Sequence, residues 1–348
     1  MNMNRRTTGS RAFVSAVAYM LVIALLLNAC AAPAKQAAGQ AQQTRSSAQV
    51  QSGQSSSELS GKIAVSGAWA LYPLMVKWAE EFQKIHPQVK IDVSAGGAGK
   101  GAADALGGLV DIGMVSRDIF PAEIEKGAFF VGAAIDAVVP VASAGNPLKD
   151  DILARGFKRQ VFVDIWINGK TANWKDVFPQ SKAFGKTDLH VYTRSDAAGA
   201  PETWAKYLGK KQEDLQGTGV YGDPGLAEAV RRDPLGIGFN NTSYAYDMKS
   251  RKQLEGLIVI PIDVNENGKI DPEENFYGTL DDVNRAISDK AYPWPPAREL
   301  YLVTLREFKG VTREFVRWLL TDGQQYAPEA GFIPLSKEKT QSELAKIR

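Results

Sequence analysis

The chain has 348 residues, enough for about two domains and a sizeable buried core. Its 41 Lys and Arg residues against 39 Asp and Glu residues give a formal charge of only +2, which argues against a protein that coats nucleic acid through bulk charge. With one cysteine and two histidines, an internal disulfide is excluded and a zinc site built from Cys and His nearly so. We therefore expect no nucleic-acid partner, and any bound anion must be held by local geometry.

The first 29 residues have the pattern of a secretory signal. Three arginines precede an uncharged apolar run from Ala12 to Leu27, which is too short and too early for a membrane-spanning helix. The run ends in Leu27-Asn28-Ala29-Cys30, which resembles the lipobox of bacterial lipoproteins. We expect residues 1–29 to be a lipoprotein signal peptide, and lipid on Cys30 to anchor the protein to the bacterial membrane, in the periplasm or at the cell surface. The alternative is an ordinary signal anchor with a free or buried cysteine.

Cleavage before Cys30 would change the charge of the protein. It removes three arginines and no acid, leaving 38 basic and 39 acidic residues, so the formal charge becomes −1. The pair Arg5-Arg6 also suggests twin-arginine export, although adjacent arginines are common in such leaders.

Residues 30–59 are predicted to be a disordered tether. They are rich in Ala, Gln, Ser and Gly and contain almost no large apolar side chain, so burial cannot offset the entropy lost on ordering. A random coil of this length has an r.m.s. reach of about 30 Å. The folded part would therefore search a volume close to the membrane.

From residue 62 onward, strands alternate with helices. Leu74, Trp78 and Phe82 recur at the four-residue spacing of a helix face, and Pro73 suits the first turn of that helix. Such alternation predicts an α/β fold with parallel strands. The expected elements are strands at 62–66, 89–93, 111–115 and 189–192, and helices at 73–85, around 102–106 and through Trp204 to Leu208.

Four strand-to-helix loops are candidate ligand loops. They comprise residues 67–72, 95–101, 116–118 and 193–200. Ligands bind α/β sheets at the carboxyl ends of the strands, where helix N-termini present unpaired N–H groups and a positive dipole end. Any one loop is more readily explained as a tight turn, but four in one chain indicate an anion-binding site.

Several segments together resemble the phosphate-binding proteins of ABC-type phosphate importers. The similarity extends in order from residue 61 to 340, and this breadth makes it more specific than any single motif. The matching segments are Val65-Ser66-Gly67 through Pro73, Lys77 to Phe82, His86-Pro87, Gly97-Ala98-Gly99, Asp111-Ile112-Gly113 with Ser116-Arg117, Asp164 to Lys170 with Trp174, Arg194-Ser195-Asp196, Gly236 to Phe239, and Phe315 to Leu335.

The resemblance implies a type II periplasmic-binding-protein fold, in which two α/β lobes joined by a two-segment hinge close on the ligand. Lobe one would comprise residues 60–142 and 298–348, and lobe two residues 143–297. It also implies a monomeric, non-enzymatic substrate-binding protein that delivers phosphate or a similar small anion to an ABC permease. No organic cofactor is expected.

The resemblance also implies ligand-binding positions in the four loops. They are Ala70 and Leu71, Ala98 and Gly99, Ser116, and Arg194, Ala198, Gly199 and Ala200. The family usually has Ser or Thr at 70, 98, 198 and 200, so this chain has lost hydroxyl donors that are each worth about 1.5–3 kcal/mol toward a charged group. We expect Lys100, Arg117 and the surviving backbone amides to compensate, and Trp69 to wall the pocket or stack on a larger ligand.

Two of these cations have plainer explanations. Arg194 and Asp196 can form a local ion pair that only shapes the turn, and Lys100 can be an exposed lysine in the first turn of a helix. The sequence alone leaves these readings open.

Residues 263–274 fit the twelve-residue calcium loop. Gly268 stands at the sharp sixth position and apolar Ile270 at the eighth. The usual entering helix is absent, because Leu257 to Ile260 reads as a strand. We expect a structural Ca²⁺ site of modest affinity, and the alternative is an Asn- and Gly-rich turn with scattered acids. The expected ligands are Asp263, Asn265, Asn267, the carbonyl of Lys269, Asp271 and Glu274.

Two other function classes compete with transport. The four alanines allow a calcium-stabilised surface scaffold or sensor with a degenerate or altered pocket. An enzyme such as a phosphoryl hydrolase is disfavoured, because neither His86 nor His190 stands beside an obvious nucleophile.

Overall fold

A computed structural model describes residues 59–182 and 188–347. The expected signal peptide, the lipidation site at Cys30 and all but the last residue of the expected tether lie outside these residues. Within the described ranges, no helix has the length and apolar character needed to cross a membrane.

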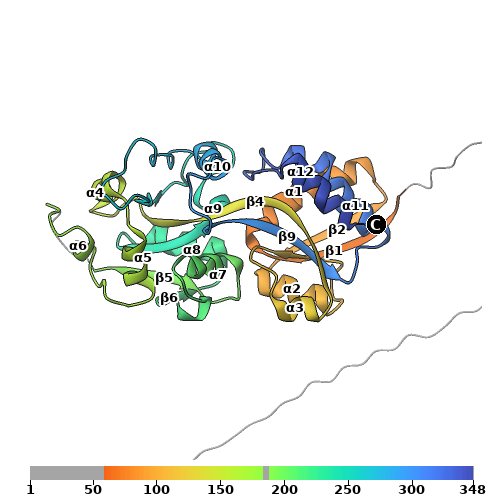
Figure 1. Ribbon diagram of the computed structural model, residues 1–348, viewed down its shortest axis with the longest axis horizontal. Coiled ribbons are helices and arrows are strands. Elements are labelled where there is room, and N and C mark those ends of the chain that lie inside the picture. Colours follow the sequence, from red (N-terminus) through yellow and green to blue (C-terminus); the bar gives the residue numbers. More distant parts are fainter. Residues whose placement is uncertain (1–58, 183–187, 348) are drawn as a thin grey trace, which may run out of the picture. The chain divides into compact units, whose positions relative to one another are not determined.

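The described residues form nine strands, twelve α-helices and three 3₁₀ helices in an alternating order (Figure 1). The strands are β1 (Gly61–Gly67), β2 (Val89–Ala95), β3 (Ile112–Val115), β4 (Ala128–Ser143), β5 (His190–Arg194), β6 (Thr218–Val220), β7 (Gly236–Asn241), β8 (Leu257–Val259) and β9 (Ala297–Leu305). The α-helices are α1 (Tyr72–Ile85), α2 (Ala98–Leu106), α3 (Pro121–Glu125), α4 (Lys149–Arg155), α5 (Arg159–Trp166), α6 (Trp174–Val177), α7 (Gly199–Tyr207), α8 (Gly222–Arg232), α9 (Thr242–Ala245), α10 (Leu280–Ser288), α11 (Gly310–Leu320) and α12 (Lys337–Lys346). The 3₁₀ helices are η1 (Trp69–Leu71), η2 (Gln212–Asp214) and η3 (Asp322–Tyr326).

The nine strands follow the order β2-β1-β3-β9-β4-β7-β5-β6, with β8 paired to β4. The pairs β1–β2, β1–β3, β5–β6 and β5–β7 are parallel, as the alternation of strands and helices predicted. The pairs that involve β4 or β9 are antiparallel. The sheet is therefore mixed, because these two long strands insert between two parallel halves.

The strands β4 and β9 run side by side from one hydrophobic core into a second one, and each strand contributes residues to both cores (Figure 1). On β4, residues up to Ala134 belong to one core and residues from Ala137 to the other. On β9, Ala297 belongs to one core and residues from Leu300 to the other. The core that contains Trp78 and Phe315 is covered by α1, α2, α11 and α12, and we call this part lobe one. The core that contains Trp166 and Trp204 is covered by α5, α7, α8 and α10, and we call this part lobe two. The boundary between the lobes was expected after residue 142, at the end of β4. On β4 the two cores separate earlier, in the middle of the strand. The predicted domain limits as a whole stay a prediction.

The helices predicted for lobe one are present, with one difference in where a helix begins. The side chains of Leu74, Trp78 and Phe82 on α1 are buried, and Trp78 Nε1 donates a hydrogen bond to the Gly323 carbonyl at 2.7 Å. Helix α2 begins at Ala98, four residues before the expected start. Near the end of lobe one, Ile333 forms an isolated bridge to Ile135 on β4.

Candidate functional site

The four predicted loops converge where the two lobes meet. Within lobe one, the amides of Gly96 and Gly97 donate to the Gly67 carbonyl at 2.8 and 3.0 Å, which joins the first loop to the second. Across the lobes, the Gly99 amide donates to the Ala197 carbonyl at 3.0 Å. Gly99 and Ala197 are 98 residues apart in sequence, and the structure brings their loops together, as the α/β topology predicted.

Gly199 allows the third and fourth loops to touch. A Cβ built on Gly199 would lie 2.1 Å from both the carbonyl oxygen and Oγ of Ser116, whereas ordinary contact begins at 3.4 Å. Ser116 follows β3 in lobe one, and Gly199 is the first residue of α7 in lobe two. A side chain at 199 would therefore hold the lobes apart.

The helices α2 and α7 both begin at this junction, one from each lobe. Their N-terminal turns contain the predicted alanine positions: Ala98 is fully buried, and Ala198 and Ala200 are 5% and 1% exposed. The amides of Ala98, Lys100, Gly199 and Ala200 have no hydrogen-bond partner within the described part of the chain. The first N–H groups of a helix lack intrahelical partners and carry a partial positive charge, so these amides can hold an anion. The other predicted positions of the first loop, Ala70 and Leu71, are buried in η1.

Arg194 is held by two carboxylates. Its Nε and Nη2 donate to the two oxygens of Asp196 at 2.8 and 2.6 Å, and its Nη1 donates to Asp223 Oδ2 at 2.6 Å. The guanidinium is fully buried. Burial acts to lower the pKa of Arg194, but the two carboxylates keep that pKa above its ordinary value, so the side chain remains charged. The local ion pair with Asp196 considered from the sequence is present, and Asp223 is a second partner that sequence reasoning missed.

Lys100 and Arg117 are also paired with acids of their own lobe. Lys100 is half exposed and forms an ion pair with Asp104, one helical turn later on α2. Arg117 donates to both oxygens of Glu123 at 2.9 and 2.7 Å. Each of these cations thus has a neighbouring carboxylate that offsets its charge. Their part in binding an anion stays a prediction, and the surviving backbone amides are the other donors of the expected set.

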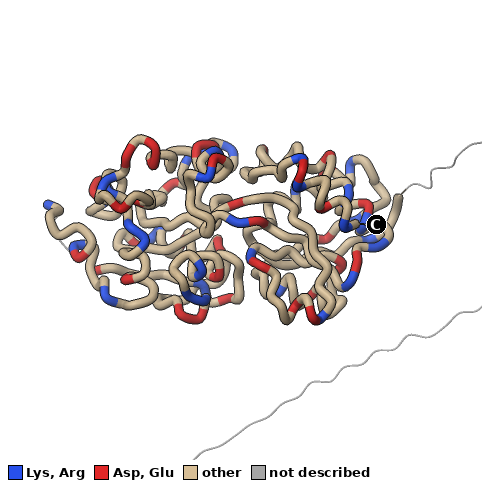
Figure 2. Tube along the Cα trace, in the orientation of Figure 1, with Lys and Arg blue, Asp and Glu red and all other residues tan. Residues whose placement is uncertain are grey.

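Figure 2 shows that Lys and Arg alternate with Asp and Glu along both lobes, without a long segment of one sign. This distribution agrees with the near-neutral composition. An anion would therefore be attracted by local dipoles and not by a broad positive surface.

Trp69 lies against the opposite lobe, as a wall of the expected pocket would. A Cβ built on Gly222 would be 3.3 Å from the indole ring, and Tyr221 packs edge-on at 6.2 Å between ring centroids. Tyr244 Oη donates to the Trp69 carbonyl at 3.2 Å. Trp69 Nε1 is buried and has no hydrogen-bond partner in the described residues. Trp69 is thus a contact between the lobes next to the four loops.

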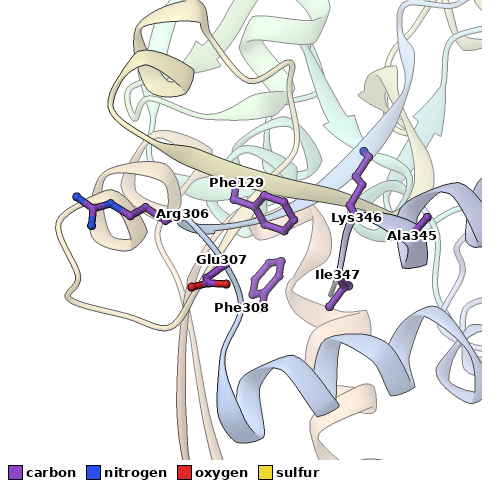
Figure 3. Close-up of a pocket in the computed structure, with 7 residues that line it drawn as sticks. All are labelled: Phe129, Arg306, Glu307, Phe308, Ala345, Lys346 and Ile347. Atoms are coloured by element: carbon purple, nitrogen blue, oxygen red, sulfur yellow. The ribbon is translucent and has the colours of Figure 1, made fainter.

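A separate cavity of about 410 Å³ lies at the far end of lobe one (Figure 3). Phe129 from β4 and Phe308 after β9 lie beside Ile347 at the end of α12, and none of the predicted ligand positions lines the cavity. Its lining residues are Phe129, Arg306, Glu307, Phe308, Ala345, Lys346 and Ile347.

The predicted calcium loop forms a tight turn in lobe two. Asp263 accepts from the amides of Asn267 and Gly268 at 3.1 and 2.8 Å, and Glu274 accepts from the amides of Val264 and Asn265 at 2.9 and 3.0 Å.

The third carboxylate of the predicted ligand set, Asp271, is hydrogen-bonded and ion-paired within the loop. Asp271 is bonded by the side-chain amides of Asn265 and Asn267 at 3.0 and 2.6 Å and pairs with Lys269. Over residues 59–182 and 188–347, no three His, Cys, Asp or Glu side chains are grouped in a way suited to a metal. Calcium binding at this loop stays a prediction.

Comparison with known proteins places the chain in a family. The model of the PBP superfamily domain matches residues 40–322. Protein SphX of Synechococcus elongatus is 28% identical over 286 residues, covering 78% of this chain and 77% of the relative. The phosphate-binding protein PstS of Bacillus subtilis is 26% identical over 288 residues, covering 80% and 83%. No comparison points to a calcium loop.

Two solved structures share the fold. A substrate-binding protein from Clostridium perfringens, solved with bound phosphate, aligns with a TM-score of 0.65 at 21% identity, covering 79% of this chain and all of that one. An ABC-type phosphate transport receptor from Vibrio cholerae aligns with a TM-score of 0.56 at 19% identity, covering 78% and 100%. With its two cores joined by β4 and β9, the chain has the type II periplasmic-binding-protein fold and belongs to the PBP superfamily, a family of binding proteins and not of enzymes.

Proposed function

We propose that this protein is an extracytoplasmic substrate-binding protein that captures phosphate for an ABC importer. The observation that carries the proposal is the meeting of two helix N-termini, α2 from lobe one and α7 from lobe two, with unpartnered amides on both. The matching relatives include proteins named as phosphate-binding, which favours phosphate among small oxyanions.

Phosphate would be bound chiefly by backbone amides. Alanines stand at four positions where the family usually has hydroxyls, and the three nearby cations are paired with carboxylates. Hydrogen bonds from amides to a charged group contribute about 1.5–3 kcal/mol each, so four amides are sufficient for binding. Losing several hydroxyl donors should make the affinity lower than in relatives that retain them.

The N-terminal sequence supports attachment to the membrane. Cys30 follows an apolar leader and precedes a polar segment of about 30 residues. We propose that lipid on Cys30 holds the binding lobes within reach of a membrane permease. Mass spectrometry of the protein from its native membrane would show a diacylglycerol-modified Cys30 as the first residue, and an unmodified or retained leader would refute this part.

Isothermal titration tests the ligand assignment. The chain beginning at Cys30, purified without lipid and dialysed free of phosphate, is titrated with phosphate and separately with sulfate. The proposal expects saturable 1:1 binding of phosphate that is tighter than binding of sulfate. No heat with phosphate at millimolar concentration would refute the assignment and leave the fold intact.

A degenerate pocket is the second candidate. The hydrogen bond from Gly99 to Ala197 and the approach of Gly199 to Ser116 show that the loops contact one another directly. In a scaffold or sensor these contacts would be permanent. Small-angle scattering distinguishes the two, because a binding protein changes its radius of gyration with ligand and a scaffold does not.

A further inference from the structure

Arg298 and Asp136 form a buried ion pair at the position where the two cores separate. They are opposite each other on the antiparallel strands β9 and β4. Arg298 Nε donates to Asp136 Oδ1 at 2.8 Å and Nη2 donates to Asp136 Oδ2 at 3.1 Å. Asp136 is fully buried and Arg298 is 6% exposed. The pair therefore lies in the segment that must bend if the lobes move.

Two hydrogen-bonded routes lead from Arg298 to the fourth loop. In the first route, Arg298 Nη1 donates to Thr203 Oγ1 at 3.0 Å. Thr203 is on α7, one helical turn after Gly199 and Ala200, whose amides are proposed to hold the anion. A shift of the Arg298 side chain therefore acts directly on the helix that begins with ligand positions.

The second route passes through lobe two. Arg298 Nη2 donates to Asn241 Oδ1, and Asn241 Nδ2 donates to Asp223 Oδ1 at 2.7 Å. The other oxygen of Asp223 accepts from Arg194 at 2.6 Å, and Arg194 holds Asp196. Asn241 and Asp223 are both 1% exposed, so water does not readily substitute for these bonds.

We propose that Arg298 is a positioning residue that couples the hinge strands to the anion-binding loop. It sets the orientation of Arg194 and of the first turn of α7 without contacting the ligand. The proposal rests on the proposed function in that phosphate is the ligand whose affinity it tunes. The contacts Asp136–Arg298–Asn241–Asp223–Arg194 form the physical path. A substitution at Asp136 or Arg298 should therefore change the position of Arg194 in the fourth loop.

The test compares Asp136→Asn and Arg298→Lys with Glu343→Gln as a matched control. Glu343 is also a buried carboxylate, paired with Lys339 and Lys346 in lobe one, but it has no bond to this network. The dissociation constant for phosphate should rise about 3- to 30-fold in the first two variants. In Glu343→Gln the dissociation constant should stay within about twofold of the wild-type value, although this variant loses a similar amount of thermal stability. Equal changes in all three would show a merely structural role and overturn the proposal.

Hydrogen exchange of the ligand-free protein separates this proposal from the proposed function. Amides of residues 194–207 should exchange faster in Asp136→Asn and Arg298→Lys than in the wild type, and at an unchanged rate in Glu343→Gln. If the wild type does not bind phosphate but this pattern appears, the coupling stands and the ligand assignment fails. Unchanged exchange in the hinge variants overturns the coupling. If these variants do not fold, Thr203→Val removes one bond only and must give the same pattern in α7.

Discussion

Replacing Gly199 with alanine should weaken phosphate binding without destabilising the fold. The new Cβ would lie 2.1 Å from the Ser116 carbonyl oxygen, about 1.3 Å short of the distance at which ordinary contact begins. Relieving such an overlap by moving backbone typically costs about 1–3 kcal/mol, which corresponds to a loss of affinity of about 5- to 150-fold. Because Ser116 and Gly199 belong to different lobes, the overlap arises only when the lobes meet.

The assay is a phosphate titration of wild type and Gly199→Ala, with the melting temperature of each measured in the absence of phosphate. Gly278→Ala is the matched control, since a Cβ at Gly278 would meet nothing within 4 Å. We expect weaker binding in Gly199→Ala, unchanged binding in Gly278→Ala, and similar melting temperatures throughout. Wild-type affinity in Gly199→Ala would refute the reasoning that the lobes bring Gly199 against Ser116 when they bind phosphate.

Three further predictions concern the buried charges and the calcium loop. Arg194→Met should lower the free energy of unfolding in urea by about 3–5 kcal/mol, because it leaves two buried carboxylates unpaired, and a loss below about 1 kcal/mol would contradict this. Burial acts to raise the pKa of Glu343, but Lys346, Lys339 and a backbone amide hold that pKa below its ordinary value of 4.5. The stabilisation by this carboxylate is therefore present above pH 4.5 and lost as the pH falls through the lowered pKa, so the melting temperatures of wild type and Glu343→Gln should differ at pH 7 and converge in acid. Addition of Ca²⁺ should raise the melting temperature of the wild type and of Glu273→Gln but not of Glu274→Gln, whereas a calcium effect that survives in Glu274→Gln would count against the predicted ligand set.

The sequence predicted the parts of the site that depend on local pattern. Apolar residues spaced by four along α1 predicted that helix, and the alternation of strands and helices predicted the four loops. The carboxyl ends of strands such as β1 and β3 meet at one edge because those strands are parallel, so the convergence of the loops follows from topology.

The pairing of charges was harder to predict. Asp104 is four residues after Lys100, so that pair alone follows from helical spacing. The partners of Arg194 and Arg298 depend on tertiary structure instead: Asp223 is 29 residues from Arg194, and Asp136 is 162 residues from Arg298. The antiparallel pairing of β4 with β9 creates the contact of Asp136 with Arg298, and the packing of α8 against β5 creates that of Asp223 with Arg194. No local pattern in the sequence indicates either contact.

An NMR titration tests the central claim most directly, because it observes the amides that are proposed to hold the anion. In ¹⁵N-labelled protein freed of phosphate, the resonances of Ala98, Lys100, Gly199 and Ala200 are followed as phosphate is added. The account predicts that signals from both helix N-termini shift together and saturate at one phosphate per protein. Binding that leaves these four amides unmoved, or no binding at millimolar phosphate, would contradict it.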